Sequence, residues 1–187
     1  MKRILLMLTG LLLCGSVGAM EVAGVNLPDS VQVDAHTLVL NGAGIRSKWF
    51  FKVYVGALYL PQRQSSAEAI IAYEHEHRMV LHMLRGLSSK RLYGAFSEAM
   101  ELNRTPAEMA AMDAQLKQMK QIFDAVDEVK EGDVITLDYL PDSGTRIGVN
   151  GTARGTIAGM EFNRALLEIW LGRKPVQEDM KKGLLGG

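Results

Sequence analysis

Residues 41–61 read NGAGIRSKWFFKVYVGALYLP, and this stretch decides the fold. Most of its residues favour β-strands, and glycines stand near its start and middle. Proline cannot donate to a sheet ladder, so Pro61 marks the end of the run. The stretch therefore predicts two strands around a turn. Arg46 lies on the first strand and Tyr54 on the second, and their side chains can meet on one face of a sheet.

The first nineteen residues have the organisation of a secretory signal peptide. Lys2 and Arg3 form a basic start, residues 4–13 are apolar, and residues 17–19 are small, as at a cleavage site. The apolar run is too short to cross a membrane as a helix, so no stable membrane insertion is expected. We expect a periplasmic or secreted protein that begins near Met20, after removal of the signal near Ala19.

The one cysteine of the chain, Cys14, lies within this signal. A lipoprotein needs a small residue before the lipidated cysteine, and Leu13 does not match that pattern. Removal of the signal leaves no cysteine, which excludes disulfide bonds, thiol catalysis and zinc–thiolate sites from the mature chain.

Length and charge bound the domain organisation and the class of partner. Residues 20–187 are enough for one domain with a sizeable core, so a single domain is expected. The chain has 21 basic and 21 acidic residues. Loss of Lys2 and Arg3 with the signal leaves 19 basic and 21 acidic residues, so the net charge of the mature chain is 19 minus 21, or −2. Because no basic block is present, nucleic acid is not an expected partner, and nothing in the sequence supports binding to an anionic membrane. The sequence does not indicate an oligomeric state.

Hydrophobic periodicity orders the other elements as strands, helices, three strands and helices. Between residues 21 and 34 the pattern predicts a small strand pair at the sheet edge, with a turn at Pro28-Asp29. Period-two patterns predict further strands at 37–40, 78–84, 134–139, 147–149 and 152–157, with a hairpin turn at Asn150-Gly151. Helical spacing predicts helices at 66–73, 88–102, 159–172 and 176–184, and one long amphipathic helix from Thr105 to about Asp127. The start of the long helix is marked by a capping box, with Thr105 as N-cap and Glu108 three residues later. This order indicates the α+β class, with an antiparallel sheet and helices packed on one of its faces.

Arg46 is the first candidate for a functional residue, since it stands among apolar and aromatic neighbours. It is either a solvent-facing residue or a fixed cation whose planar fork holds a carboxylate or an enolate. Tyr54 can share that anion, or fill the core with its hydroxyl satisfied. His75 and His77 would point to one side of a strand with the spacing of a metal pair, but no third ligand is apparent. No metal and no cofactor are therefore expected.

Four blocks of the sequence together resemble the chalcone isomerase-like family, in particular its exported bacterial members. They are residues 41–46 (NGAGIR), 51–60 (FKVYVGALYL), 84–90 (LRGLSSK) and 159–172, which begins GMEF and ends IWLG. The resemblance implies an open-faced β-sandwich, with a large antiparallel sheet, a layer of helices and a ligand cleft between them.

The resemblance also assigns roles to individual residues. In the plant isomerases of this fold, an arginine of the first block holds the oxyanion that develops during ring closure, and Arg46 matches it. Tyr54 stands where those enzymes have a threonine, Leu87 where they have a tyrosine, and Ile169 where a hydroxyl group is expected. The fatty-acid-binding branch of the fold pairs the arginine with a tyrosine on the neighbouring strand to hold a carboxylate, and Tyr54 looks similar to that tyrosine.

Three hypotheses follow, and whether the protein is an enzyme stays open among them. In the first, which we favour, an exported protein binds a small apolar carboxylate such as a fatty acid without catalysis, through Arg46, Tyr54, Leu87 and Ile169. In the second, an isomerase of the intramolecular lyase type cyclises a chalcone-like enone, with Arg46 as oxyanion clamp. In the third, a structural or interaction protein of the cell envelope uses Arg46 only to pair with an internal carboxylate.

Overall fold

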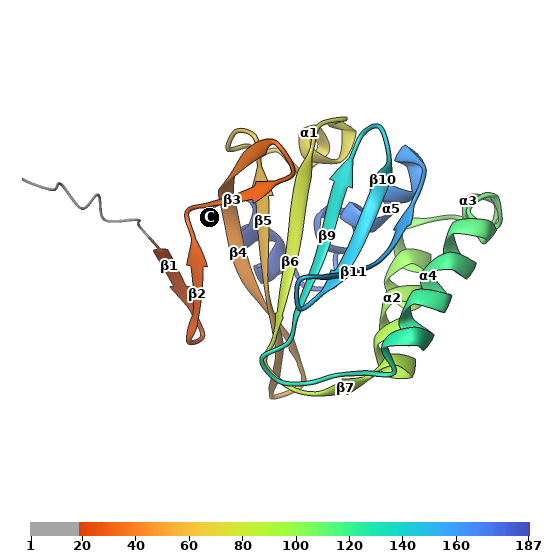
Figure 1. Cartoon of the computed structure of the whole chain (residues 1–187), viewed down its shortest axis with the longest axis horizontal. Coiled ribbons are helices and arrows are strands. Elements are labelled where there is room, and N and C mark those ends of the chain that lie inside the picture. The colour runs from red at the N-terminus through yellow and green to blue at the C-terminus, as the bar shows by residue number, and fades with distance from the viewer. Residues whose placement is uncertain (1–18) are drawn as a thin grey trace, which may run out of the picture.

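The computed structural model describes residues 19–187, in which a seven-stranded antiparallel sheet forms the centre of the fold (Figure 1). The strand order is β11-β10-β9-β6-β5-β4-β3. These strands are β3 (Ser30–Val33), β4 (His36–Lys48), β5 (Phe51–Leu60), β6 (His77–Met83), β9 (Val134–Leu140), β10 (Gly144–Val149) and β11 (Thr152–Ile157). Two separate strand pairs are β1 (Ala19–Val22) with β2 (Val25–Pro28), and β7 (Leu87–Ser88) with β8 (Glu128–Val129). The expected signal peptide lies outside the described residues, apart from Ala19 at the start of β1.

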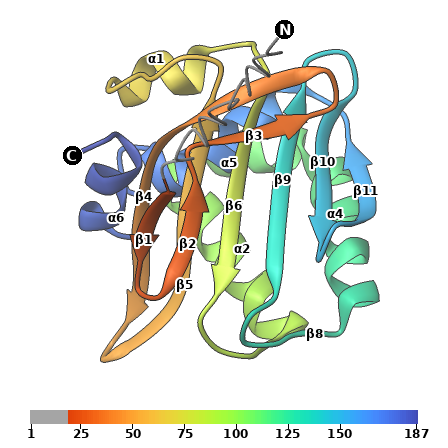
Figure 2. The ribbon, with the colours of Figure 1, turned by 60° about the vertical axis from the view of Figure 1, so that its left-hand side comes forward.

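The helices contribute to one large hydrophobic cluster on a single face of this sheet. They are α1 (Ala67–Ala72), α2 (Ser89–Asn103), α3 (Pro106–Ala111), α4 (Asp113–Val126), α5 (Met160–Leu171) and α6 (Glu178–Leu184). In Figure 2, α2, α4 and α5 lie behind the sheet, whereas β1 and β2 form a hairpin in front of β4 and β5. A smaller cluster that includes the fully buried Leu27 joins this hairpin to the sheet. The expected α+β class, a large antiparallel sheet with a helix layer on one face, is confirmed.

Within residues 19–187, no helix combines the length and the apolar composition that crossing a lipid bilayer would require.

Local sequence signals define several of these elements. Thr105 and Glu108 form the expected capping box, in which the Thr105 hydroxyl accepts from the Glu108 N–H and the Glu108 carboxylate accepts from the Thr105 N–H. Asn150 and Gly151 join β10 to β11 with φ angles of 51° and 75°. Positive φ at both central residues is the geometry of a type I′ hairpin turn, which explains why this dipeptide predicted the hairpin.

The single long helix expected after Thr105 is wrong, because the segment forms two helices. Met112 separates α3 from α4, with φ of −103° and ψ of 14°. Its N–H donates to the Met109 carbonyl, three residues back, so the α-helical ladder is interrupted. The break turns the Met112 side chain into the core, where it is 5% exposed. The apolar spacing continues through Met112, and periodicity alone therefore does not show the break.

The strand pair expected at the sheet edge between residues 21 and 34 also differs from the structure. Only β3 lies at the edge, paired with β4. β1 and β2 pair with each other around Ala23 and Gly24, which both have positive φ. β2 ends at Pro28, which pairs with Ala19, and a bend at Asp29 separates the hairpin from β3. Proline has no N–H to donate, so it suits the end of a strand.

Glycines in β4 and β5 allow α6 to lie directly on the sheet. A Cβ at Gly42 would collide with the Gly183 carbonyl oxygen, and one at Gly44 would lie 2.8 Å from the Cα of Met180. Gly56, the partner of Gly44 in the ladder, leaves room for the Met180 side chain. The glycines of the opening stretch therefore serve the packing of the C-terminal helix.

Asn41 fixes the end of α6 from a bulge in β4. The ladder moves from Leu40 to Gly42 without pairing Asn41. The buried side-chain amide of Asn41 donates to the carbonyl oxygens of Leu184 (2.7 Å) and Gln64 (3.0 Å). This bulge and the glycines together bring the segment before α6 to the part of β4 that carries Arg46.

Candidate functional site

Arg46 and Tyr54 are direct partners across the β4–β5 ladder, as the sequence predicted. Directly opposed residues of antiparallel strands have Cβ atoms about 5 Å apart, so their side chains can act on one ligand group. A β-bulge follows this pair, because Ser47 pairs with Lys52 and Val53 has no partner residue on β4. Bulges re-aim neighbouring side chains and are common beside functional sites.

Both side chains line a cavity between the sheet and the helices, with a volume of about 740 Å³. Its walls come from β4, β5, β6, β9 and β10 on one side and from β7, α2, α4 and α5 on the other. Most lining residues are apolar, among them Leu81, Met83, Phe96, Ile122, Phe123 and Ile147. The volume falls within the roughly 300–1,000 Å³ that is usual for small-molecule sites.

Leu87 and Ile169, the two other residues predicted for the site, line the same cavity. Leu87 belongs to β7, and Ile169 lies on α5 and is 5% exposed. Neither side chain has a polar group. The four residues named from the sequence thus lie around one cavity, two of them with polar groups and two with apolar surface.

The guanidinium of Arg46 is held at one nitrogen and open at the others. Its Nη1 donates to the carbonyl of Ser47 at 2.6 Å and to Oε1 of Gln177 at 3.4 Å. In the part of the chain that the structure describes, Nε and Nη2 donate to no protein acceptor, and no acidic side chain forms an ion pair with Arg46. The third hypothesis required such a carboxylate partner. The Nε–Nη2 edge is the one that binds a carboxylate through two parallel hydrogen bonds.

Gln177 holds the strand on both sides of Arg46, and the sequence did not point to it. Its Nε2 donates to the carbonyl of Ile45 at 3.0 Å, and its Oε1 accepts from the N–H of Ser47 at 2.8 Å. Gln177 immediately precedes α6, which the glycines of β4 place against the sheet. The contact joins residues 130 apart in the sequence, so no local pattern could show it.

The hydroxyl of Tyr54 accepts a hydrogen bond from Nε1 of Trp170 at 2.9 Å. An indole N–H can only donate, so the hydroxyl hydrogen of Tyr54 stays available for a ligand acceptor. Burial raises the pKa of Tyr54 to about 12, against smaller opposite effects of the Trp170 hydrogen bond and the Arg46 charge. Tyr54 is therefore a protonated donor at neutral pH and is poorly suited to act as a base.

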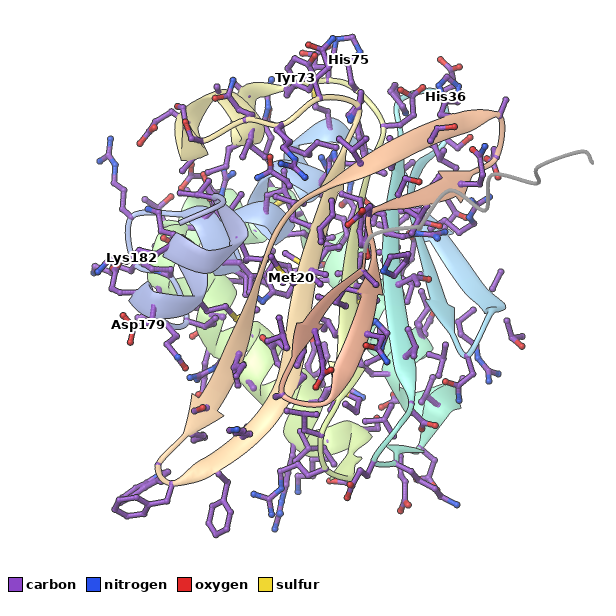
Figure 3. The ribbon with its side chains drawn as sticks, turned by 90° about the vertical axis from the view of Figure 1, so that its left-hand side faces the viewer. Met20, His36, Tyr73, His75, Asp179 and Lys182 are labelled. Carbon is purple, nitrogen blue, oxygen red and sulfur yellow. The ribbon has the colours of Figure 1, made fainter. Side chains whose placement is uncertain are left out.

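His75 and His77 do not point to one side, because β6 begins only at His77. The His77 ring is buried, with Nε2 3.1 Å from Oδ1 of Asn163 and Nδ1 3.1 Å from the His75 carbonyl oxygen. His75 is exposed beside Tyr73 at the upper edge of the molecule in Figure 3, with 4.2 Å between the ring centroids. Between residues 19 and 187, no group of three or more His, Cys, Asp or Glu side chains is arranged to hold a metal ion.

Comparison with known proteins adds the family to this geometry. A sequence model described as chalcone isomerase-like matches residues 19–186. The chain belongs to the chalcone isomerase-like family. No curated protein sequence matches this chalcone isomerase-like chain significantly.

Among solved structures, the chalcone isomerase-like chain is similar to a fatty-acid-binding protein of Arabidopsis thaliana. The TM-score is 0.69 at 16% sequence identity, over 90% of this chain and 96% of that chain. At this identity the likeness shows a shared fold, and the site has to be argued from its own residues.

The chalcone isomerase-like site can bind a molecule with an anionic end and an apolar body. Arg46 and Tyr54 line the cavity from adjacent strands, and both have hydrogen-bond donors that no acceptor among residues 19–187 uses. The apolar wall around them has few groups that could pair with further polar atoms of a ligand. This arrangement favours ligands whose polar atoms are confined to one acceptor group.

Proposed function

We propose that this chalcone isomerase-like protein binds a small, largely apolar carboxylate such as a fatty acid and does not transform it. The observation that carries the proposal is the open edge of Arg46 beside the free hydroxyl hydrogen of Tyr54 on the wall of an apolar cavity of about 740 Å³. An ionised carboxylate only accepts hydrogen bonds, and Nε and Nη2 of Arg46 with the Tyr54 hydroxyl offer it three donors. The shared fold with a fatty-acid-binding protein supports this proposal.

Head group and alkyl body contribute differently to such binding. Hydrogen bonds to charged groups contribute roughly 1.5–3 kcal/mol each, and burial of a methylene contributes about 0.8 kcal/mol. The apolar lining therefore sets the affinity through chain length. Arg46 and Tyr54 select an acid over a neutral lipid and orient it in the cavity.

The chemistry of the lining supports binding without turnover. Tyr54 remains protonated because its pKa is raised to about 12, and Leu87 and Ile169 add no donor. Loss of one donor from an oxyanion site costs roughly 3–4 kcal/mol of transition-state stabilisation, and here two of the positions are apolar. A chalcone should thus cyclise in the presence of the protein at the rate seen in buffer, followed by its absorbance. A faster rate that Arg46→Gln abolishes would establish the isomerase in place of the binder.

Native mass spectrometry tests the binding proposal. Protein purified from its own source should carry a co-purified lipid acid, and Arg46→Ala should lose it. Arg173→Ala is the matched control, because Arg173 is exposed and lies outside the cavity lining. A spectrum without lipid, together with no measurable affinity for added dodecanoate, would contradict the proposal.

Export to the periplasm or the medium is part of the same proposal and rests on the first nineteen residues of the sequence. N-terminal sequencing of the protein isolated from cells should give a chain that begins near Met20. An intact N-terminus on cytoplasmic protein would contradict export.

A further inference from the structure

The turn between β4 and β5 exposes three aromatic side chains in a row. Trp49 is 85% exposed, Phe50 97% and Phe51 59%. In Figures 1 and 2 this turn projects at the lower end of the molecule. Large apolar groups at the tip of a projecting hairpin gain nothing from the fold of their own chain, so they indicate contact with something outside it.

The backbone conformation of this turn also indicates a role outside the fold. Trp49 has a φ of 59°, in the left-handed region that glycine and asparagine adopt readily and bulky residues adopt at a cost. Trp49 and Phe50 stand at the two central turn positions, where the usual hairpin residues are small or polar. The turn therefore departs from the usual residue preferences of a hairpin, although Trp49 and Phe50 remain exposed. Departures of this kind concentrate at functional sites.

Basic side chains surround the aromatic tip, although they are far apart in the sequence. Lys48 and Lys52 flank the turn itself. The guanidinium carbon of Arg85 lies 4.6 Å from the centroid of the Phe51 ring. Lys90 and Arg91 are exposed in the first turn of α2, where the helix dipole disfavours cations, and that first turn contains no acidic residue. Exposed acidic residues lie next to the start of α2, where the Ser89 N–H donates to the Asp127 carbonyl and Ser88 pairs with Glu128. The basic residues that belong to the tip itself or contact it are therefore Lys48, Lys52 and Arg85.

The tip is continuous with the cavity described above. Lys48, Trp49, Phe51, Arg85 and Arg91 all line it. The tip thus adds aromatic rings and cations to a cavity whose lining is otherwise mostly apolar, with Glu98 of α2 as its acidic member. A surface docked on the tip would therefore contact residues that line the cavity.

We propose that the β4–β5 tip docks on an anionic lipid surface, with its aromatic rings at the level of the head groups and its basic residues on the lipid phosphates. Tryptophan and phenylalanine next to lysine and arginine are the composition of interfacial membrane anchors. A narrow projecting tip can enter a bilayer interface, whereas a protein partner would require a broader complementary surface. The basic residues of the tip lie between positions 48 and 85 of the sequence, which is why no basic block predicted this surface. Transfer of a carboxylate between membrane and cavity rests on the proposed function, but docking itself does not.

Vesicle flotation tests the electrostatic part of the proposal. The protein should float with vesicles of phosphatidylcholine and phosphatidylglycerol in equal parts, and high salt should release it. Lys52→Gln should lower the affinity for these vesicles about fivefold, the usual contribution of one basic residue near an anionic surface. Lys182→Gln on α6 is the matched control, because Lys182 lies away from the tip in Figure 3 and should leave the affinity unchanged. Equal losses in the two variants would overturn the proposed surface, as would the absence of binding to the anionic vesicles.

Phe50→Ser tests the aromatic part, since Phe50 is almost fully exposed and does not line the cavity. It should abolish flotation and leave the circular dichroism spectrum and the affinity for dodecanoate unchanged. Tyr73→Ser, which removes an exposed aromatic ring at the opposite end of the molecule, should still float. Conversely, Arg46→Ala should lose dodecanoate and still float, so docking and ligand binding can fail separately.

Fluorescence identifies the segment that meets the lipid. The chain has two tryptophans, and Trp170→Phe leaves Trp49 as the sole emitter. Its emission should shift to shorter wavelength on anionic vesicles and be quenched by brominated lipid chains. Flotation without either change would show that another face docks and would overturn the proposal. Capture of the tip by an envelope protein, with no binding to pure lipid, would overturn it as well.

Discussion

Replacement of Tyr54 by phenylalanine removes one hydroxyl group from the candidate site and keeps the ring. The hydroxyl accepts from Trp170 Nε1 at 2.9 Å and has its own hydrogen left for a ligand carboxylate. A hydrogen bond to a charged group contributes roughly 1.5–3 kcal/mol, so the affinity for a fatty acid should fall about 10- to 150-fold. The indole N–H also loses its acceptor in a buried place, which should lower the free energy of unfolding by about 1–3 kcal/mol.

Calorimetric titration with dodecanoate and urea denaturation measure these two effects on the same sample. Tyr59→Phe is the matched control, because Tyr59 lies on the same strand but packs in the cluster on the opposite face. It should leave the affinity unchanged. Since Tyr54 keeps its proton up to a pKa of about 12, its contribution should not vary between pH 6 and pH 9. If Tyr54→Phe binds dodecanoate as tightly as the unchanged protein, the hydroxyl does not hold the ligand.

Three further predictions concern the groups that support the site and the fold. Gln177→Ala removes two hydrogen bonds to the backbone of β4, at roughly 1 kcal/mol each. The free energy of unfolding, measured by urea denaturation, should therefore fall by about 2 kcal/mol, and an unchanged value would contradict the positioning role of Gln177. Burial lowers the pKa of His77 to about 4, so the stability it contributes is complete above pH 6.5 and should fall by about 3 kcal/mol as the pH drops from 6.5 to 4. The same pH dependence in His77→Gln would contradict this. Asp138→Asn leaves Arg78 and Arg146 without their shared carboxylate and should lower the free energy of unfolding by about 3 kcal/mol. Asp142→Asn, at an exposed position, should leave the midpoint of thermal denaturation unchanged.

Much of the fold followed from patterns within short segments. The capping box, the Asn150-Gly151 turn and the alternation of apolar residues report on contacts close in sequence, and these elements lie where they were expected. The pairing of Arg46 with Tyr54 followed from a single hairpin. Leu87 and Ile169 required the family resemblance, because nothing in their own segments places β7 and α5 around one cavity.

Other features depend on contacts that no local pattern encodes. The contact of Gln177 with β4 arises only once α6 lies on the glycines of that strand. The break at Met112 is invisible to periodicity, because Met109, Met112, Leu116 and Met119 keep helical spacing across it and all pack in the large cluster. The basic residues of the β4–β5 tip gather only in the folded chain, where Arg85 lies against the Phe51 ring. Sequence reasoning therefore found the two anion-binding candidates and missed the parts that position and surround them.

The central claim is that Arg46 and Tyr54 hold the carboxylate of an otherwise apolar ligand. The most direct test compares the affinities for dodecanoate and for dodecanol, which share the alkyl chain and differ in the head group. The unchanged protein should bind the acid at least about tenfold more tightly than the alcohol, and Arg46→Ala should bind the two equally. Equal affinities in the unchanged protein would contradict the claim.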